Sequence, residues 1–211
     1  EDWEKTYTDG LKYLGMKFDQ ERSEPFEGAS GVIHPLLGEA VTNFQAQAYK
    51  ELLPANGPVK TQVVGAYDAA LEEQAQRVSD FMNYQIVHVM EEYDEELDQM
   101  LFYLPLAGSA FKKIYYDESL GRAVSKFIAP EDLIVPYFTT DLESCPRITN
   151  VVKMPENEVA KMQAMGFYRK VKVSYGEDAA QYGQVEEEID ELSGMEPGYD
   201  TGEVSVSVSY T

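Results

Sequence analysis

The sequence predicts an α+β fold, in which amphipathic helices pack on a small mixed or antiparallel sheet that includes a β-hairpin. Three observations support this prediction. Apolar residues recur at three- and four-residue steps in the first half of the chain, and the period changes to two after Gly108. Hydrophobic residues make up 44% of the 211 residues, which is enough for a proper core.

Helical patterns fill the first half of the chain. A short amphipathic helix is expected within residues 1–27, and a longer one over residues 35–53, between Pro35 and Pro54. The cleanest pattern runs from Leu71 to Tyr93. It either continues or bends and restarts through Leu97, Leu101 and Leu104, and we expect Pro105 and Gly108 to end it.

Strand patterns dominate the next part of the chain. The runs "SAFKKIYYD" and "RAVSKFI" flank the turn-forming stretch "DESLG", which predicts a hairpin over residues 109–128. The runs "EDLIVPY" and "RITNVVKM" predict two further extended segments. Pro155 then opens a short helix that Gly166 is placed to cap, and "FYRKVKV" is interpreted as one more strand.

The C-terminal part of the chain differs in composition. Residues 173–211 hold ten Asp and Glu and no Lys or Arg. We interpret residues 174–203 as a mobile acidic loop, and the closing "VSVSVSY" as an edge strand that pairs with another strand. The predicted division is therefore a domain over residues 1–172, followed by an acidic loop and edge strand over residues 173–211.

Charge and cysteine content exclude several classes of protein. The net charge of −21 argues against a general DNA-binding surface, because phosphate neutralisation requires clustered Lys and Arg. The same charge would be repelled by an anionic membrane, and no apolar run approaches the ~20 residues that span a bilayer. A single cysteine, Cys145, permits neither an intrachain disulfide nor a cysteine-based zinc site.

One acidic stretch, "MEEYDEELDQM" at residues 90–100, is a candidate for chemistry. Glu91 and Glu95, like Glu92 and Glu96, are spaced by four residues and share a helix face. Such pairs could bind a cation or act as the acid and base of a hydrolase. A solvated helix face is the favoured interpretation.

Other catalytic or ligand-binding motifs are missing from the sequence. His34 and His88 lack metal-ligand spacing, Cys145 has no histidine near it in sequence, and the glycines of "EGASGVIHP" lack the lysine of a phosphate-binding loop. We therefore predict no catalytic, cofactor-binding or metal-binding residues, no cofactor, and a protein that is not an enzyme.

Basic and aromatic residues alternate in the predicted hairpin. This pattern could bind a single-stranded nucleic acid by stacking and charge. The alternative, which the acidic surroundings favour, is that the cations pair with carboxylates of a neighbouring helix or subunit. The basic residues are Lys112, Lys113, Arg122 and Lys126, and the aromatic residues are Phe111, Tyr115, Tyr116 and Phe127.

Several long strings resemble the portal proteins of tailed bacteriophages, particularly the long podovirus-type portals. They are "PFEGASGVIHPLLGEAVTNFQAQAYKELLPANGPVKTQVVG", "RVSDFMNYQI", "EEYDEELDQMLFYLPLAGSAFKKIYYDESLGRAVSKFIAPEDLIVPY" and "DLESCPRITNVVKMPENEVAKMQAMGFYR". They occur in the family's order, and the similarity covers about residues 3–172.

The resemblance implies a structural role. Portals form a homo-oligomeric ring, usually a dodecamer, at one vertex of the capsid in the virion. The ring is assembled in the host bacterial cytoplasm, and it serves genome packaging, genome ejection and attachment of the tail. The implied partners are other copies of the chain, the major capsid protein, terminase and tail adaptor proteins, while double-stranded DNA passes through without sequence-specific binding. ATP hydrolysis belongs to the terminase motor.

The strings resemble the outer, N-terminal wing region of the portal subunit. Family members are much longer, and their stem helices, tunnel loop and clip are not recognisable, so we expect this chain to be part of a longer subunit. The hairpin is then expected to be scaffold. The alternative function is a free-standing acidic binding module that recognises a basic protein partner through residues 174–203.

Overall fold

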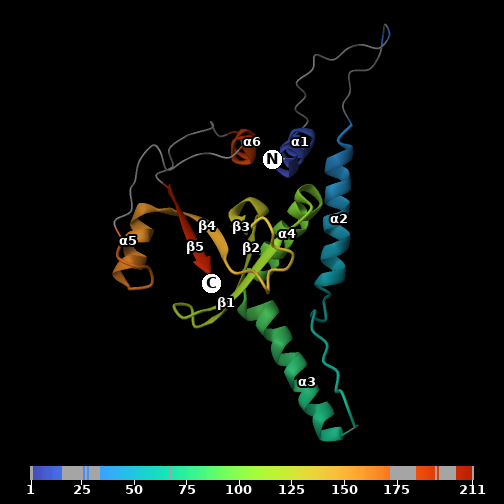
Figure 1. Ribbon diagram of the computed structural model, residues 1–211. Helices are drawn as coiled ribbons and strands as arrows, with labels where there is room; N and C mark the ends of the chain where they lie inside the picture. Colours follow the sequence, from blue (N-terminus) through green and yellow to red (C-terminus); the bar gives the residue numbers. More distant parts are fainter. Residues whose placement is uncertain are drawn as a thin grey trace. The chain divides into compact units, whose positions relative to one another are not determined.

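The computed structural model describes residues 2–15, 26, 28, 34–66, 68–171, 184–192, 194 and 203–210. The chain divides into two compact units, one over Leu36–Ala129 and one that joins Glu1–Pro35 to Pro130–Thr211. Helices and small antiparallel sheets make up both units, which confirms the predicted α+β class (Figure 1).

Four helical segments lie in the first part of the central unit, Leu36–Ala129. They are α2 (Leu36–Leu52), α3 (Ala69–Tyr84), the π-helical turn η1 (Gln85–Val89) and α4 (Tyr93–Ala107). The expected helix over residues 35–53 is confirmed by α2. Of the two possibilities for the longer pattern, the chain bends and restarts, because Met90 leaves the helical conformation (φ −89°, ψ 76°).

The end of α4 differs in part from the prediction. Pro105 lies inside the helix and does not end it, and the helix continues to Ala107. Gly108 alone ends it, with φ of 77°, and its N–H donates to the Leu104 carbonyl. A left-handed residue that closes a helix in this way is usually glycine, which has no Cβ to clash.

The predicted hairpin is confirmed by β1 (Phe111–Asp117) and β2 (Arg122–Ile128), which pair antiparallel. The Asp117 carboxylate accepts hydrogen bonds from the N–H groups of Ser119 (2.8 Å) and Leu120 (3.3 Å), which stabilises the turn. Helix α4 packs against α2 and against β2. It is therefore the central element of this unit, and Leu97 and Leu101 are buried on it.

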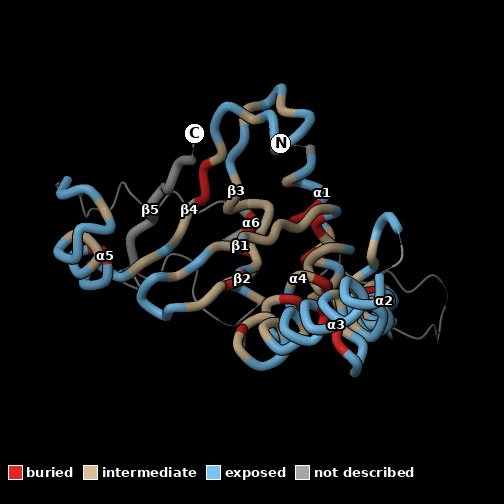
Figure 2. The backbone as a smooth tube through the Cα atoms, turned by 90° about the horizontal axis from the view of Figure 1, so that it is seen from below, coloured by how far each residue is buried: buried red, intermediate tan, exposed pale blue. Residues whose placement is uncertain are grey.

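Helix α3 has few packing partners in the central unit, and most of its residues are exposed (Figure 2). The segment that precedes α3, including residues 59–61, runs along one side of this helix. Ser79 Oγ and Asn83 Nδ2 both donate to the Val59 carbonyl at 3.0 Å, and Thr61 Oγ1 donates to the Ala75 carbonyl at 2.7 Å. These bonds connect the segment to the helix mainly through polar groups.

The described residues of the second unit form three α-helices and a three-stranded antiparallel sheet in the order β3-β4-β5. Helix α5 packs on β4, and α6 packs on α1. Its elements are α1 (Asp2–Leu14), the 3-10 turn η2 (Pro130–Asp132), β3 (Leu133–Ile134), β4 (Ile148–Pro155), α5 (Glu156–Ala164), α6 (Gln184–Leu192) and β5 (Glu203–Tyr210).

This unit confirms most of the expected elements. Helix α1 lies within residues 1–27, α5 follows Pro155, and β5 pairs along its whole length with β4, as the alternating "VSVSVSY" predicted. Tyr7, Leu11 and Val185 are buried where α1 and α6 meet.

Two predictions for this unit need correction. Phe167–Val171 is not a strand, because the N–H groups of Phe167 and Tyr168 both donate to the Met162 carbonyl and continue the C-terminal turn of α5. Residues 184–192, expected in a mobile loop, form α6. The rest of the predicted loop, and the predicted boundary between residues 172 and 173, lie outside the described residues apart from residues 194 and 203.

Candidate functional site

The acidic stretch of α4 is where the structure gathers most of the sequence-predicted candidates. Asp94, Glu95 and Glu96 lie in its first turn, where carboxylates interact favourably with the positive end of the helix dipole. The stretch has three different environments. Glu92 and Glu96 contact the hairpin, Asp94 and Asp98 contact α2, and Glu91 and Glu95 are exposed.

Glu92 and Glu96 bind the outer edge of β2. Glu92 accepts hydrogen bonds from Arg122 Nη1 at 2.6 Å and from the Ser125 N–H at 3.2 Å. Glu96 accepts one from the Phe127 N–H at 2.6 Å. The carboxylates therefore take the place that a third strand would occupy. We call this arrangement the carboxylate clamp and define it as Glu92, Glu96, Arg122, Ser125 and Phe127.

The clamp depends on a match between two backbone repeats. Glu92 and Glu96 are four residues apart, which at about 1.5 Å per residue is about 6 Å along a helix. Outward-facing N–H groups on a strand recur every two residues, about 6.7 Å apart. Successive helical carboxylates can therefore reach successive N–H groups of one strand edge. This arrangement satisfies edge donors that would otherwise invite another strand.

The electrostatics of the clamp keep Glu92 ionised. Partial burial alone would raise the pKa of Glu92, but hydrogen bonds from its own backbone N–H, from Arg122 and from the Ser125 N–H lower the pKa below its ordinary value. The Arg122–Glu92 ion pair is mostly sheltered, since the two side chains are 22% and 19% exposed. It therefore contributes more than an open surface pair would.

Lys112 approaches the same helix from the hairpin. Its ammonium lies over the Tyr93 ring, 3.6 Å from the ring centroid, in a cation–π contact. Burial lowers the pKa of Lys112, while the nearby Glu96 carboxylate opposes that change. Its Nζ is buried and makes no hydrogen bond in the described part of the chain. The contact therefore positions the strand and offers no proton donor to solvent.

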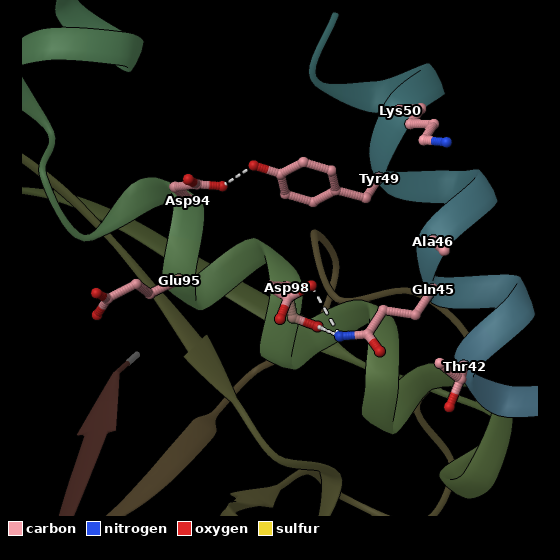
Figure 3. A pocket seen from close by; sticks show the side chains of 8 residues that line it. All are labelled: Thr42, Gln45, Ala46, Tyr49, Lys50, Asp94, Glu95 and Asp98. Carbon is pink, nitrogen blue, oxygen red and sulfur yellow. Dashed lines mark hydrogen bonds between the residues drawn. The ribbon is translucent and has the colours of Figure 1, made fainter. Parts of the chain in front are cut away.

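A hollow of about 510 Å³ lies between α2 and α4 (Figure 3). Gln45 Nε2 donates to Asp98 Oδ1 at 2.7 Å, and the Tyr49 hydroxyl donates a short bond to the Asp94 carboxylate. That bond, with burial and the charges of Asp94 and Asp98, raises the pKa of Tyr49 to about 12. The hollow between α2 and α4 is lined by Thr42, Gln45, Ala46, Tyr49, Lys50, Asp94, Glu95 and Asp98.

Two sequence predictions can be judged on this site. Pairing of the hairpin cations with a neighbouring helix is confirmed for Arg122, which bonds Glu92, and Lys112 also contacts α4. The solvated-face interpretation is wrong for Glu92 and Glu96, because both are partly buried and accept hydrogen bonds from β2. Lys126 is exposed.

The remaining candidates lie elsewhere. His88 is in η1, with its ring 5.5 Å from that of Tyr84, and His34 is exposed just before α2. Cys145 is half-buried in an irregular segment, and its Sγ donates to the Arg147 carbonyl at 3.1 Å. Sequence reasoning missed Gln45 and Tyr49, because their spacing on α2 gives no sign of which residues they contact.

The described residues offer little for catalysis or metal binding. Among them, no group of three or more His, Cys, Asp or Glu side chains is arranged to hold a metal ion. None of the described helices is both long and apolar enough to cross a membrane. A general acid at neutral pH needs a raised carboxyl pKa, whereas that of Glu92 is lowered. The site is best described as a structural joint that connects α4 to the β1–β2 hairpin and to α2.

Comparisons with known proteins add no assignment. No protein-family model matches the chain, and a search of curated proteins returns no match.

Proposed function

We propose that the chain is the wing region of a portal subunit of a tailed bacteriophage, part of a homo-oligomeric ring at the capsid vertex. The observation that carries this proposal is the set of long strings, in the family's order over about residues 3–172, that resemble podovirus-type portals. The role is structural: subunits associate around an axis, DNA passes through during packaging and ejection, and the tail attaches to the ring.

The packing of the hairpin supports a scaffold role. A surface that binds nucleic acid needs accessible cations beside accessible aromatic rings. In this hairpin the Arg122 guanidinium is bound to Glu92, and the Lys112 ammonium is buried over Tyr93. Two of the four hairpin cations therefore serve the joint with α4.

The charge of the chain also agrees with a conduit. With 38 acidic and 17 basic residues, the chain offers little counterion release to DNA, so DNA would slide past without sticking. Neutralising acidic residues on a channel-facing surface should then retard DNA passage during packaging.

The acidic binding module has one observation in its favour, the ten carboxylates and no cations of residues 173–211. Part of that segment is already occupied, because α6 packs on α1 with Val185 and Glu188 buried. A module that binds through an accessible acidic segment would therefore lose the buried face of α6, including the Glu188 carboxylate, from its binding surface. We prefer the portal proposal.

The solution mass of the chain tests the proposal. Light scattering and negative-stain electron microscopy, over a range of salt and protein concentrations, should show a closed ring for this chain or for the longer subunit that is expected to contain it. Twelve copies of a 23.8 kDa chain give about 290 kDa. If this chain and the longer subunit that is expected to contain it both remain monomers under all conditions, self-assembly is contradicted and the binding module is favoured. A Lys112→Glu, Lys113→Glu double variant that keeps subunit stability and ring assembly would contradict the scaffold role of the hairpin.

A further inference from the structure

The two outer edges of the hairpin are treated differently by the structure. The clamp occupies the edge of β2, where Glu92 and Glu96 accept the N–H groups of Ser125 and Phe127. The opposite edge, on β1, has no partner strand in the described part of the chain, because the hairpin sheet contains β1 and β2 alone. One edge is closed and the other is open.

The register identifies the groups on the open edge. In an antiparallel pair, the N–H and C=O of one residue point to the same side, and residues alternate along the strand. The N–H groups of Ser125 and Phe127 point away from β1, so those of their partners, Ile114 and Lys112, point away from β2. Tyr116, two residues further on, follows the same direction.

The centre of this edge has little of the usual protection, because β1 has no proline, pairs with β2 without a bulge, and has Lys113 as its one charged residue between Lys112 and Asp117. Proteins guard open edges with proline, bulges or charged side chains that project beside the strand. The middle of β1 instead exposes Ile114 (69%) and Tyr116 (65%). Lys112, the cation nearest to them on that face, is turned over the Tyr93 ring of α4. An exposed strand edge of this kind is complementary to one occupant, another extended strand.

We propose that the outer edge of β1 pairs with β5 of a second copy of the chain. Among the described residues, β5 is also an edge strand, since the second sheet has the order β3-β4-β5 and β4 occupies one side of it. It is eight residues long and β1 is seven, so nearly all of both ladders could pair. Together they would join a two-stranded and a three-stranded sheet from two copies.

Charge favours β5 over a second β1. Lys113 and Lys126 lie directly opposite each other in the hairpin ladder, an unfavourable arrangement for like charges. Pairing two β1 strands would bring more cations to the same place. Strand β5 itself contains one charged residue, Glu203, and residues 173–211 around it hold no cation, so pairing with β5 would bring no further positive charge to this place.

This inference rests on the proposed function, because it names a contact through which ring subunits would join. A contact between β1 and β5 uses two different surfaces, so each copy can donate one and accept the other. Heterologous contacts of this kind close into rings when the rotation allows it. Self-pairing of β1 would give an isologous dimer and no ring.

A labelled peptide of residues 196–211 tests the contact without requiring assembly. We expect saturable binding to the whole chain, measured by fluorescence anisotropy, with an affinity that decreases as salt rises. The same peptide with Ser205→Pro and Val206→Pro, neighbours whose N–H groups lie on opposite edges of the strand, loses a donor on whichever edge pairs and should bind about tenfold more weakly. A peptide of residues 110–118 serves as the probe for β1 self-pairing.

The protein variant Ile114→Pro removes one outward N–H and leaves the bonds between β1 and β2 in place, since proline is tolerated on an edge strand. Ile114→Thr is the matched control, because it keeps the N–H and a β-branched side chain. We expect about tenfold weaker peptide binding for Ile114→Pro and less than a threefold change for Ile114→Thr. Tyr116→Pro repeats the test if Ile114→Pro alters the far-UV circular dichroism.

The possible results separate this contact from the ring itself. Peptide binding that decreases with either proline variant supports the contact, whether or not rings form. Equal binding to wild type and both proline variants overturns it, as does tighter binding of the 110–118 peptide. Rings that persist in folded Ile114→Pro and Tyr116→Pro variants also overturn it, and leave the portal proposal standing.

Discussion

Removing the Glu96 carboxylate should loosen the hairpin from α4, and the structure gives the magnitude. Glu96→Ala deletes the acceptor of the partly buried Phe127 N–H, a 2.6 Å bond. A hydrogen bond to a charged group contributes about 1.5–3 kcal/mol. The loss also removes the Glu96 charge, which raises the pKa of the buried Lys112 ammonium and so favours its charged form. We expect the local free energy of unfolding to decrease by about 2 kcal/mol.

The measurement must report on the central unit. The one tryptophan, Trp3, lies in α1 of the other unit, so its fluorescence would not follow the hairpin. Hydrogen exchange of peptides that cover residues 122–128 is the suitable assay. A decrease of about 2 kcal/mol corresponds to about thirtyfold faster exchange, since each 1.4 kcal/mol is a factor of ten.

Two controls make the result interpretable. Glu95→Ala removes a carboxylate from the same first turn of α4, but the Glu95 side chain is exposed and is not part of the clamp. It should leave exchange of β2 unchanged. Glu96→Gln keeps an acceptor oxygen without the charge and should give an intermediate rate. Equal exchange rates for Glu96→Ala and Glu95→Ala would refute the clamp, because water would then be satisfying the Phe127 N–H equally well.

Three further predictions concern single groups. Stability of the central unit should decrease as pH falls through the lowered pKa of Glu92, below its ordinary value of 4.5, because the ionised form is favoured in the folded state. Acid titration followed by circular dichroism should show this loss in wild type and a smaller one in Glu92→Gln. The Tyr49 phenol, with its pKa raised to about 12, should ionise in ultraviolet titration above ordinary tyrosines. The folded state favours the neutral form of the Tyr49 phenol. The contribution of Tyr49 to stability is therefore complete below pH 10.0 and is lost as pH rises toward 12. Tyr49→Phe should abolish this pH dependence of stability. Gly108→Ala should lower the unfolding free energy by about 1 kcal/mol, since φ is 77° and a Cβ there meets no atom within 4 Å, so the cost is conformational. Gly10→Ala, in the middle of α1 with equal space around it, should instead be neutral or stabilising, and urea denaturation compares the two.

Local periodicity and turn chemistry were sufficient to predict most of the elements. Helix α2, the hairpin and β4 follow from apolar spacing, and from prolines and turn residues that act over a few positions. The break between α3 and α4 was left open, because the apolar pattern continues across it. The chain leaves the helix at Met90 after a π-helical turn, and periodicity alone does not report such a turn.

Two errors in prediction have the same physical origin. "FYRKVKV" has strand composition, yet the N–H groups of Phe167 and Tyr168 are used by the C-terminal turn of α5. Residues 184–192 have too many carboxylates to look buried, yet Val185 and Glu188 pack where α6 meets α1. In each case a contact with a neighbouring element decided the conformation, and single-sequence propensity does not include that contact.

The candidate site shows which part of the contact between α4 and β2 can be predicted from the sequence. The stretch "MEEYDEELDQM" gives the four-residue spacing of Glu92 and Glu96, and hence a shared helix face. It does not say whether that face meets water or a strand. The excess of cations in the hairpin, in a chain with a net charge of −21, is the additional signal. A helix with carboxylates four residues apart can accept hydrogen bonds from a strand edge. A basic hairpin that follows the helix provides such an edge together with cations that favour the contact. The same pattern leaves the opposite edge of the hairpin open, which is why we place the contact between copies on β1.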